Sequence, residues 1–287
     1  MANPVLVGVD GSAESFAAAR WAGEEAALRH LPVELLNVWQ APISNVQFSP
    51  APEGLRFWEE NQVREAGKEL AERHQGLDIT VRQVAGTPMN VLVEAAATAE
   101  MVVLGSRGLG EMYGFFQGSV GLHVAARSER PVVAVRAEGA ARETGRREVV
   151  VGLDLGRPDD PPLAFAFASA AARGATVRAL HVWDRHREYG YAAPPPGPQL
   201  ARELRIEQVE GLAAMLAPWR ARFPGVEVKE TVVDGPVAQR LIEAADGTVL
   251  LVVGRRRRPA PAVIRIGPVT HAALHHAVCP VAIVPHD

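Results

Sequence analysis

The chain repeats itself, and this repeat constrains its fold more than any other feature. The segment Val7–Asp10, Val-Gly-Val-Asp, returns 144 positions later as Val151–Asp154, Val-Gly-Leu-Asp. The segment Val102–Gly105 returns 149 positions later as Leu251–Gly254. Two offsets that differ by only five residues indicate a single duplication followed by a short insertion.

The duplication predicts two domains, which we expect at residues 1–138 and 147–287, joined by a polar stretch at 137–147 that is rich in Ala, Gly and Arg. A net charge of -3 argues against a protein that wraps nucleic acid or coats anionic lipid. Cys279 is the single cysteine, which suits a reducing compartment. The first residues lack the pattern of an export signal. We therefore expect a cytoplasmic protein that binds neither nucleic acid nor membrane.

Within each copy, short apolar runs alternate with helical patterns. In the first copy the apolar runs predict strands at Pro4–Val9, Val33–Trp39, Asp78–Ala85, Met101–Leu104 and Pro131–Arg136. The second copy follows the same order. Because parallel strands need crossover connections, this alternation predicts an α/β fold. We expect two tandem doubly wound, Rossmann-like domains, each a five-stranded parallel sheet with helices on both faces.

The helical patterns of the first copy also carry start signals. Thr87 is expected to cap the third helix, with Pro88 in its first turn, and Gly235-Pro236 takes this place in the second copy. The predicted helices of the first copy are Ser12–His30, Glu53–Gln75, Pro88–Thr98 and Ser119–Ser128.

Open α/β sheets bind ligands beyond the carboxyl ends of their strands. There, Asp10 follows the first predicted strand, and a glycine-rich loop from Gly105 leads to Gly118-Ser119 at the start of a helix. Glycines allow close backbone approach, and a helix N-terminus offers unpaired N–H groups to an anion. No lysine follows such a loop, which excludes a P-loop, and Tyr113 breaks the dinucleotide fingerprint. The alternative is a tight loop without a ligand, with Asp10 merely capping the first helix.

One spacing remains: two glycines three apart, nine intervening residues, then Gly-Ser. On these residues, Gly105, Gly108, Gly118 and Ser119, the sequence resembles the ATP-binding branch of the universal stress protein family, in a tandem arrangement. The resemblance extends over nearly the whole chain. It includes Val-Gly-Val-Asp-Gly-Ser at 7–12, Arg-Trp-Ala at 20–22, Gly-x-Pro at 86–88 and Cys-Pro-Val at 279–281. It implies the adenine nucleotide α-hydrolase-like form of the Rossmann-like fold.

The resemblance also implies an ATP site in the first copy, accompanied by Mg²⁺ that phosphate and water hold rather than dedicated protein ligands. Asp10 would lie at the adenine, Val38 would hold it through its main chain, and Ser119 would bind outer phosphates. The implied nucleotide-binding residues are Gly8, Val9, Asp10, Val38, Gly105, Ser106, Arg107, Gly108, Gly118, Ser119 and Val120.

The second copy departs from this pattern. Arg257 stands where the first copy has Gly108, and Pro268 replaces Ser119, which removes a hydroxyl and a backbone donor. We expect nucleotide binding there to be weak or absent, at a second site of Asp154, Val182, Gly254 and Gly267. The opposing interpretation is that Arg255–Arg258 adds charge that grips phosphate.

Other reactive patterns are sparse. His271 and His275 have the four-residue spacing of a two-histidine metal site, but no third ligand is near in sequence, so surface or interdomain histidines are expected. No serine elbow or paired nucleophile is present. We therefore predict neither catalytic residues nor metal ligands.

Three hypotheses for function follow. The first is a nucleotide-binding regulatory protein of the stress response, whose conformation or partners respond to ATP occupancy. The second is a slow ATP-hydrolysing enzyme acting through Arg107, and the third is a tandem scaffold without a ligand. Family members pair through their fifth strands. We expect a homodimer, or an intrachain pseudo-dimer with Val132–Val135 against Val281–Val284.

Overall fold

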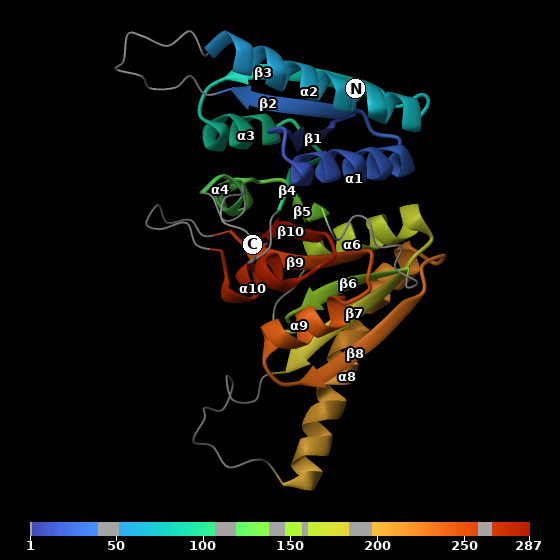
Figure 1. Ribbon diagram of the computed structural model, residues 1–287. Helices are drawn as coiled ribbons and strands as arrows, with labels where there is room; N and C mark the ends of the chain where they lie inside the picture. The colour runs from blue at the N-terminus through green and yellow to red at the C-terminus, as the bar shows by residue number, and fades with distance from the viewer. Residues whose placement is uncertain are drawn as a thin grey trace. The chain divides into compact units, whose positions relative to one another are not determined.

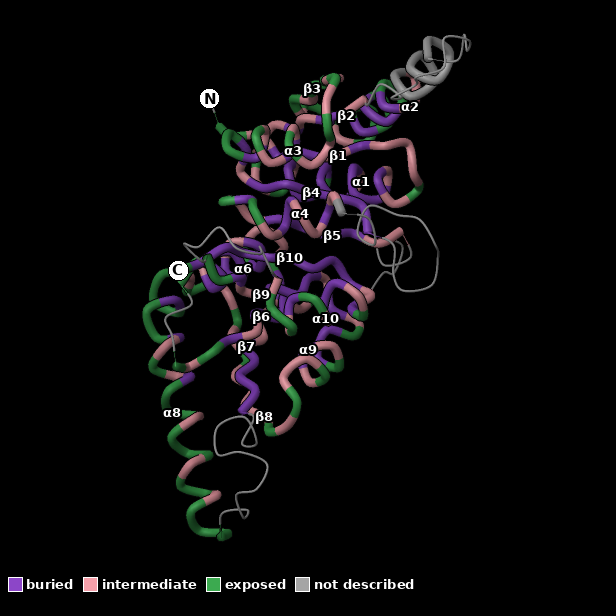
Figure 2. Tube along the Cα trace, turned by 90° about the vertical axis from the view of Figure 1, so that its left-hand side faces the viewer, coloured by how far each residue is buried: buried purple, intermediate pink, exposed green. Residues whose placement is uncertain are grey.

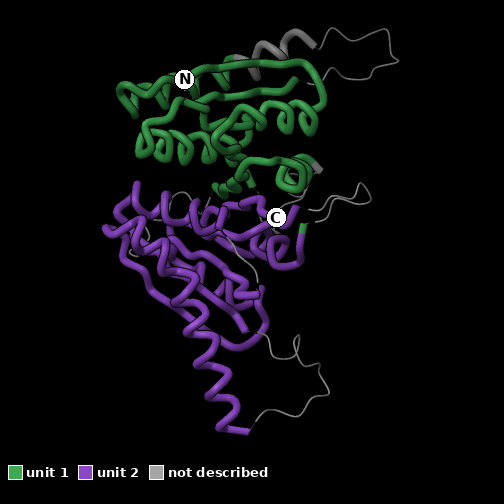
Figure 3. The backbone as a smooth tube through the Cα atoms, turned by 180° about the vertical axis from the view of Figure 1, so that it is seen from behind, with its two compact units in different colours: residues 1–142, 260–266 green, residues 143–259, 267–287 purple. Residues whose placement is uncertain are grey.

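The computed structural model describes residues 2–39, 52–106, 119–137, 147–156, 160–183, 197–257 and 266–287. The chain divides into two compact units, which Figure 3 shows in separate colours. Unit one contains residues 1–142 and 260–266, and unit two contains residues 143–259 and 267–287.

Unit one is a parallel sheet between two layers of helices. Its described strands follow the order β3-β2-β1-β4-β5. The chain moves outward from β1 to β3 and then in the opposite direction through β4 to β5. Right-handed crossovers therefore place α1 and α2 on one face and α3 and α4 on the other, and each of these pairs is in contact (Figure 1). The elements are β1 (Val5–Gly8), α1 (Ala13–Arg29), β2 (Val33–Trp39), α2 (Pro52–Arg73), β3 (Ile79–Ala85), α3 (Pro88–Ala96), β4 (Met101–Gly105), α4 (Ser119–Arg127) and β5 (Val132–Val135).

Unit two repeats this topology, with the described strands in the order β10-β9-β6-β7-β8 and all pairs parallel. The helix pairs α6 with α8, and α9 with α10, are in contact. The predicted α/β class is thus confirmed in both units. The elements are β6 (Glu148–Leu153), α6 (Asp160–Arg173), β7 (Thr176–Trp183), α8 (Pro198–Arg222), β8 (Val228–Asp234), α9 (Val237–Ala245), β9 (Leu250–Arg256), α10 (Pro268–His276) and β10 (Val281–His286).

The core of each unit lies along its central strands, which are buried on both faces (Figure 2). Every residue of β4 and β5 is buried, as expected for a sheet covered by helices on both sides. Small residues let the helices lie close to the sheet. A Cβ atom on Gly8 would lie 2.6 Å from Leu104 Cδ2 on the neighbouring strand and 3.4 Å from Leu92 Cδ2 on α3, and one on Gly152 would lie 2.7 Å from Leu241 Cδ2 on α9. The repeat therefore preserves a glycine beneath the equivalent helix in both units.

Two predicted helix starts need correction. Thr87 occupies the N-cap position of α3 with Pro88 in the first turn, but its side chain forms no capping hydrogen bond. In unit two Pro236 is itself the N-cap, and α9 begins only at Val237. Both helices therefore start on a proline-fixed backbone rather than on a side-chain cap.

Helix α8 is held to its sheet along only part of its length. Its buried residues Leu212, Leu216 and Trp219 all lie in the C-terminal half. Towards the N-terminus, Leu200, Ile206 and Val209 are exposed, and Figure 2 shows this half extending away from the strands. Neither α8 nor any other helix among the described residues is long and apolar enough to cross a membrane.

Candidate functional site

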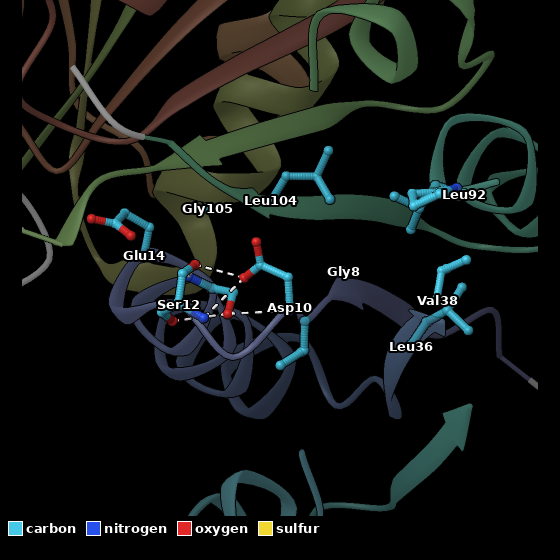
Figure 4. A pocket seen from close by; sticks show the side chains of 12 residues that line it. Gly8, Asp10, Ser12, Glu14, Leu36, Val38, Leu92, Leu104 and Gly105 are labelled. Atoms are coloured by element: carbon cyan, nitrogen blue, oxygen red, sulfur yellow. Dashed lines mark hydrogen bonds between the residues drawn. The ribbon is translucent and has the colours of Figure 1, made fainter. Parts of the chain in front are cut away.

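A pocket opens in unit one at the carboxyl ends of β1, β2 and β4, where the first turns of α1 and α3 begin (Figure 4). It contains about 470 Å³ of empty space, including the part open to solvent. This is the edge at which open α/β sheets bind ligands. The lining residues are Gly8, Val9, Asp10, Ser12, Glu14, Ser15, Leu36, Val38, Pro88, Leu92, Leu104 and Gly105.

The pocket has an apolar end and a polar end. Figure 4 shows Val38 and Leu92 on one side and Asp10 and Ser12 on the other, with Gly8 between them. Leu36, Leu92 and Leu104 are almost completely buried, at 0%, 3% and 4% exposure. A ligand that fits both ends is flat and apolar at one end and carries polar groups at the other.

The polar end is organised around Asp10. Its Oδ1 atom accepts from the Ser12 amide at 3.0 Å and from the Ser12 hydroxyl at 2.6 Å. This turn uses a positive φ of 83° at Gly11. Figure 4 shows the other carboxylate oxygen pointing away from Ser12, toward the strand that carries Leu104. Asp10 therefore contributes to the local fold with one oxygen and presents the other to the pocket.

Ser12, rather than Asp10, caps the first helix. Its hydroxyl oxygen accepts from the Ser15 amide at 3.2 Å, and its backbone adopts the extended conformation of an N-cap. The Ser15 hydroxyl in turn donates to the Ser12 carbonyl at 2.9 Å. The alternative role expected for Asp10, capping α1, thus belongs to its neighbour.

At the apolar end, the hydrogen-bond ladder between β1 and β2 stops early. The Val9 amide donates to the Leu36 carbonyl at 2.9 Å. In a continuing parallel ladder the Val38 amide would then donate to the Val9 carbonyl. Instead that carbonyl accepts from the side-chain amide of buried Asn37 at 2.9 Å. A side chain therefore takes the position of a main-chain partner.

This interruption leaves the main chain of Val38 on the pocket side of β2. The ladder toward β3 uses alternate residues, from the Val33 amide bonded to Asp78 through to the Trp39 carbonyl bonded to Gly86. Val38 lies between these positions in the alternation, so its N–H and C=O point toward β1 and the pocket. The pocket thus combines an apolar wall with a backbone donor and acceptor.

Gly105 is required by the fold itself. A Cβ atom there would lie 2.6 Å from the Glu14 carbonyl carbon, 2.7 Å from the Ser15 nitrogen and 2.8 Å from the Glu14 oxygen. These are backbone atoms of the first turn of α1, which passes directly over the end of β4. The glycine therefore has a packing role whether or not a ligand is bound.

The predicted site residues are only partly brought together. Gly8, Val9, Asp10, Val38 and Gly105 line the same pocket. Among the other described members of the predicted set, Ser106 is buried just beyond β4 with its amide bonded to the Val135 carbonyl, and Val120 is half-buried in the first turn of α4. Neither lines the pocket. Ser119 begins α4, and Arg107, Gly108 and Gly118 lie outside the described residues.

Sequence reasoning missed part of the lining. Leu36, Leu92 and Leu104 lie in strands or helices where apolar residues indicate core. Leu104 is the next-to-last residue of β4, but Leu36 lies in the middle of β2 and Leu92 follows the first turn of α3, so position along the element did not mark these two. Glu14 and Ser15 lie in the first turn of α1, and this position was the available signal for them.

The second site of the repeat is arranged differently. Asp154 is exposed and its Oδ1 accepts from the Gly156 amide at 3.2 Å. A Cβ atom added to Gly254 would lie 2.7 Å from His286 Nε2, so the buried His286 ring fills the space beside this glycine. Val182 is 8% exposed, and Gly267 is the N-cap of α10, with open space where its Cβ would be.

Arg257 does not occupy the space beside Gly254. Its guanidinium lies 3.7 Å from the Asp287 carboxylate, and its amide donates to the His286 carbonyl at 2.7 Å. The obstruction beside Gly254 comes from His286.

One titratable group on α4 has a perturbed pKa. Burial, and secondarily the nearby Arg127 guanidinium, lower the pKa of His123 below its ordinary value. Both effects disfavour the imidazolium form, so His123 favours a neutral ring in the folded protein.

Comparisons with known proteins cover both copies. The family model of the universal stress proteins matches residues 1–136 and again 145–285. Universal stress protein Rv2005c of Mycobacterium tuberculosis is 32% identical over 97% of this chain and 96% of its own length. A universal stress protein from Mycolicibacterium smegmatis is 31% identical over 98% of this chain and 96% of its own length. The crystal structure of a universal stress protein from Archaeoglobus fulgidus covers both chains completely with a TM-score of 0.70, and at 18% identity it supports the fold alone.

Proposed function

Since the chain belongs to the universal stress protein family over both of its copies, we propose that unit one binds an adenine nucleotide in the pocket beside Asp10 and Val38. The nucleotide we propose is ATP with Mg²⁺. Its occupancy would regulate the conformation of the protein or its binding to partners. Cys279, the single cysteine, is compatible with the cytoplasm as the place of action.

The observation that carries this proposal is the unfinished ladder at Val38. Adenine is a flat ring with hydrogen-bonding groups along one edge, and it needs an apolar slot beside a backbone donor and acceptor. The walls formed by Leu36, Leu92 and Leu104, with the main chain of Val38 at their edge, meet that need. The oxygen of Asp10 that points away from Ser12 is an acceptor for a ring amine or a ribose hydroxyl.

The phosphates would leave the pocket past Gly105 toward the start of α4. The first turn of this helix, which begins at Ser119, has unpaired N–H groups and the positive end of the helix dipole. We propose that Ser106, Arg107, Gly108 and Gly118 connect the two regions and that Val120 belongs to the same anion site. Magnesium would be held by phosphate and water.

For unit two we propose weak binding or none. His286 lies beside Gly254, in the space that the ribose and phosphates of a bound nucleotide would need. Pro268 begins α10 and offers no N–H to an anion. The residues Asp154, Val182, Gly254 and Gly267 therefore form, at most, a site of low affinity.

The test is to denature the purified chain and identify any released nucleotide by mass spectrometry. Calorimetric titration of nucleotide-free protein with ATP, ADP, AMP and cyclic AMP then gives affinity and stoichiometry. We expect one molecule of ATP per chain, with Gly108→Glu and Asp10→Ala each weakening binding at least tenfold. Asp154→Ala, the matched change in unit two, should leave the affinity unchanged.

Two results would overturn the proposal. Absence of binding by all four nucleotides would remove the ligand. Equal losses in Asp10→Ala and Asp154→Ala would remove the assignment to unit one. Because Asp10 also bonds Ser12, circular dichroism of each variant is needed to separate lost binding from lost folding. We also propose that two chains associate, which light scattering of the nucleotide-free and ATP-bound protein would measure.

A further inference from the structure

Two histidines on α10 direct their ring nitrogens at each other. The Nε2 atoms of His271 and His275 are 3.1 Å apart, and the ring centroids are separated by 4.2 Å. The two residues lie one helical turn apart. His271 is exposed and His275 is half-buried, so solvent reaches the pair.

We propose that this pair binds one divalent transition-metal ion of the zinc or nickel class. The ion would be coordinated by Nε2 of His271 and Nε2 of His275, with water in the remaining positions. Imidazole is a preferred ligand of such ions, and residues at i and i+4 on one helix face are neighbours. The ligand class follows from the donor atoms, because two imidazole nitrogens select against the hard ions Mg²⁺ and Ca²⁺.

The separation of the two nitrogens fits a shared metal. With metal–nitrogen bonds of about 2.0–2.1 Å, nitrogens 3.1 Å apart subtend roughly 100° at the ion. This angle lies between those of octahedral and tetrahedral coordination, so the separation of the two nitrogens suits a shared ion. In the metal-free protein the same geometry lets one ring donate a hydrogen bond to the other. On metal binding the donor ring would carry its proton on Nδ1 instead of Nε2, so that both Nε2 atoms offer a lone pair to the ion.

The position on the helix also favours a cation. His275 belongs to the last turn of α10, which ends at His276. The negative end of the helix dipole, with its unpaired carbonyl groups, lies there. This field partly compensates the charge that the metal brings to the surface.

The pair is specific to unit two. At the 149-residue offset, α10 corresponds to α4, which has the same length. There the two histidines are replaced by Leu122 and Ala126. The copy whose phosphate motif departs from the family pattern is thus the copy that carries the histidine pair.

The coordination sphere would remain open. Among the residues that the structure describes, no cluster of three or more metal-binding side chains is present. The protein would supply two ligands, so we expect a reversible site whose water positions are available for exchange rather than a closed structural site.

The experiment uses the full chain without an affinity tag. Equilibrium dialysis against Zn²⁺, and separately Ni²⁺, with metal analysis by mass spectrometry, gives the stoichiometry and affinity. We expect one ion per chain. His271→Ala and His275→Ala should each weaken binding at least tenfold, whereas His276→Ala, a change of the adjacent exposed residue, should leave it within twofold. Alanine favours helix, so these variants should remain folded.

A second measurement follows the helix rather than the metal. A metal that joins two turns should slow amide hydrogen exchange in the last turn of α10, and His271→Ala should abolish this protection. The proposal fails if both single variants bind like the wild type, if His276→Ala loses as much as they do, or if no ion binds. It also fails if bound metal leaves exchange in α10 unchanged.

Discussion

The contact between Gly105 and the first turn of α1 makes a quantitative prediction about replacement of this glycine by alanine. The new Cβ atom would lie 2.6–2.8 Å from three backbone atoms of Glu14 and Ser15. Ordinary contact begins near 3.4 Å, so the helix start must retreat by about 0.6–0.8 Å. It cannot do so freely, because the Ser12 cap and its bonds to Asp10 hold the turn in place.

The expected cost follows from these distances. Overpacking of a core usually costs about 1–3 kcal/mol, and an obstacle made of backbone places Gly105→Ala near the upper end. Alanine also lowers the conformational entropy of the unfolded chain, which stabilises the folded protein by about 0.4–1 kcal/mol. We therefore expect a net loss of about 2 kcal/mol in the free energy of unfolding of unit one.

Gly254, at the equivalent position of unit two, provides the matched control. There the nearest atoms belong to the His286 ring, at 2.7 and 3.0 Å, which a rotation of the side chain can move. An off-rotamer side chain costs about 0.5–1.5 kcal/mol, and the entropy gain offsets much of it. Gly254→Ala should therefore cost about 1 kcal/mol or less.

The assay must separate the two units, because a chain of two domains need not unfold in one step. Hydrogen exchange read by mass spectrometry under increasing urea reports the opening free energy of peptides from β4 and from β9. Equal losses for Gly105→Ala and Gly254→Ala, or a larger loss for the latter, would refute the argument from backbone contact.

Three further predictions concern single side chains. Ser12→Ala removes the cap of α1 and one partner of Asp10, and should lower the free energy of unfolding by about 1 kcal/mol in urea titrations, with an unchanged value contradicting the capping role. Asn37→Ala deprives the buried Val9 carbonyl and the half-buried Gln83 side-chain amide of their partner and should cost about 1–3 kcal/mol by the same titration; a loss well below this would mean that another donor replaces it. Because burial and Arg127 hold the pKa of His123 below its ordinary value near 6.5, the unfolded chain binds this proton more readily, so stability falls as the pH drops through that value and below. His123→Gln should reduce this loss, and an identical pH dependence of the urea midpoint in both proteins would show that His123 makes no contribution.

The sequence was sufficient for the fold because its signals are local. Runs such as Met101–Gly105 are apolar at every position, which is typical of a strand covered on both faces, and they alternate regularly with helical patterns. Helix starts were less predictable. At Thr87 the residue type suited a side-chain cap, yet the hydroxyl makes no such bond.

The site was predictable in its location but not in its construction. Asp10 was identified because it follows the end of a strand at the edge where ligands bind, and Val38 was identified through the family resemblance. Asn37 was not identified, since nothing in the sequence indicates that a side chain would take over the hydrogen bond of a strand. The role of Gly105 was assigned to a ligand alone, whereas its neighbour in space is the backbone of Glu14 and Ser15. Contacts between segments distant along the chain leave no periodic pattern to read.

The side-chain bond at the end of β1 has a counterpart in unit two, where the Nδ1 atom of His181 lies 3.0 Å from the Leu153 carbonyl. An amide in one copy and an imidazole in the other thus contact the carbonyl at the end of the first strand from the same position of the second. Fitting a nucleotide into unit two would accordingly require changes at His286 on β10 and at the start of α10, while the contact between His181 and Leu153 could stay as it is.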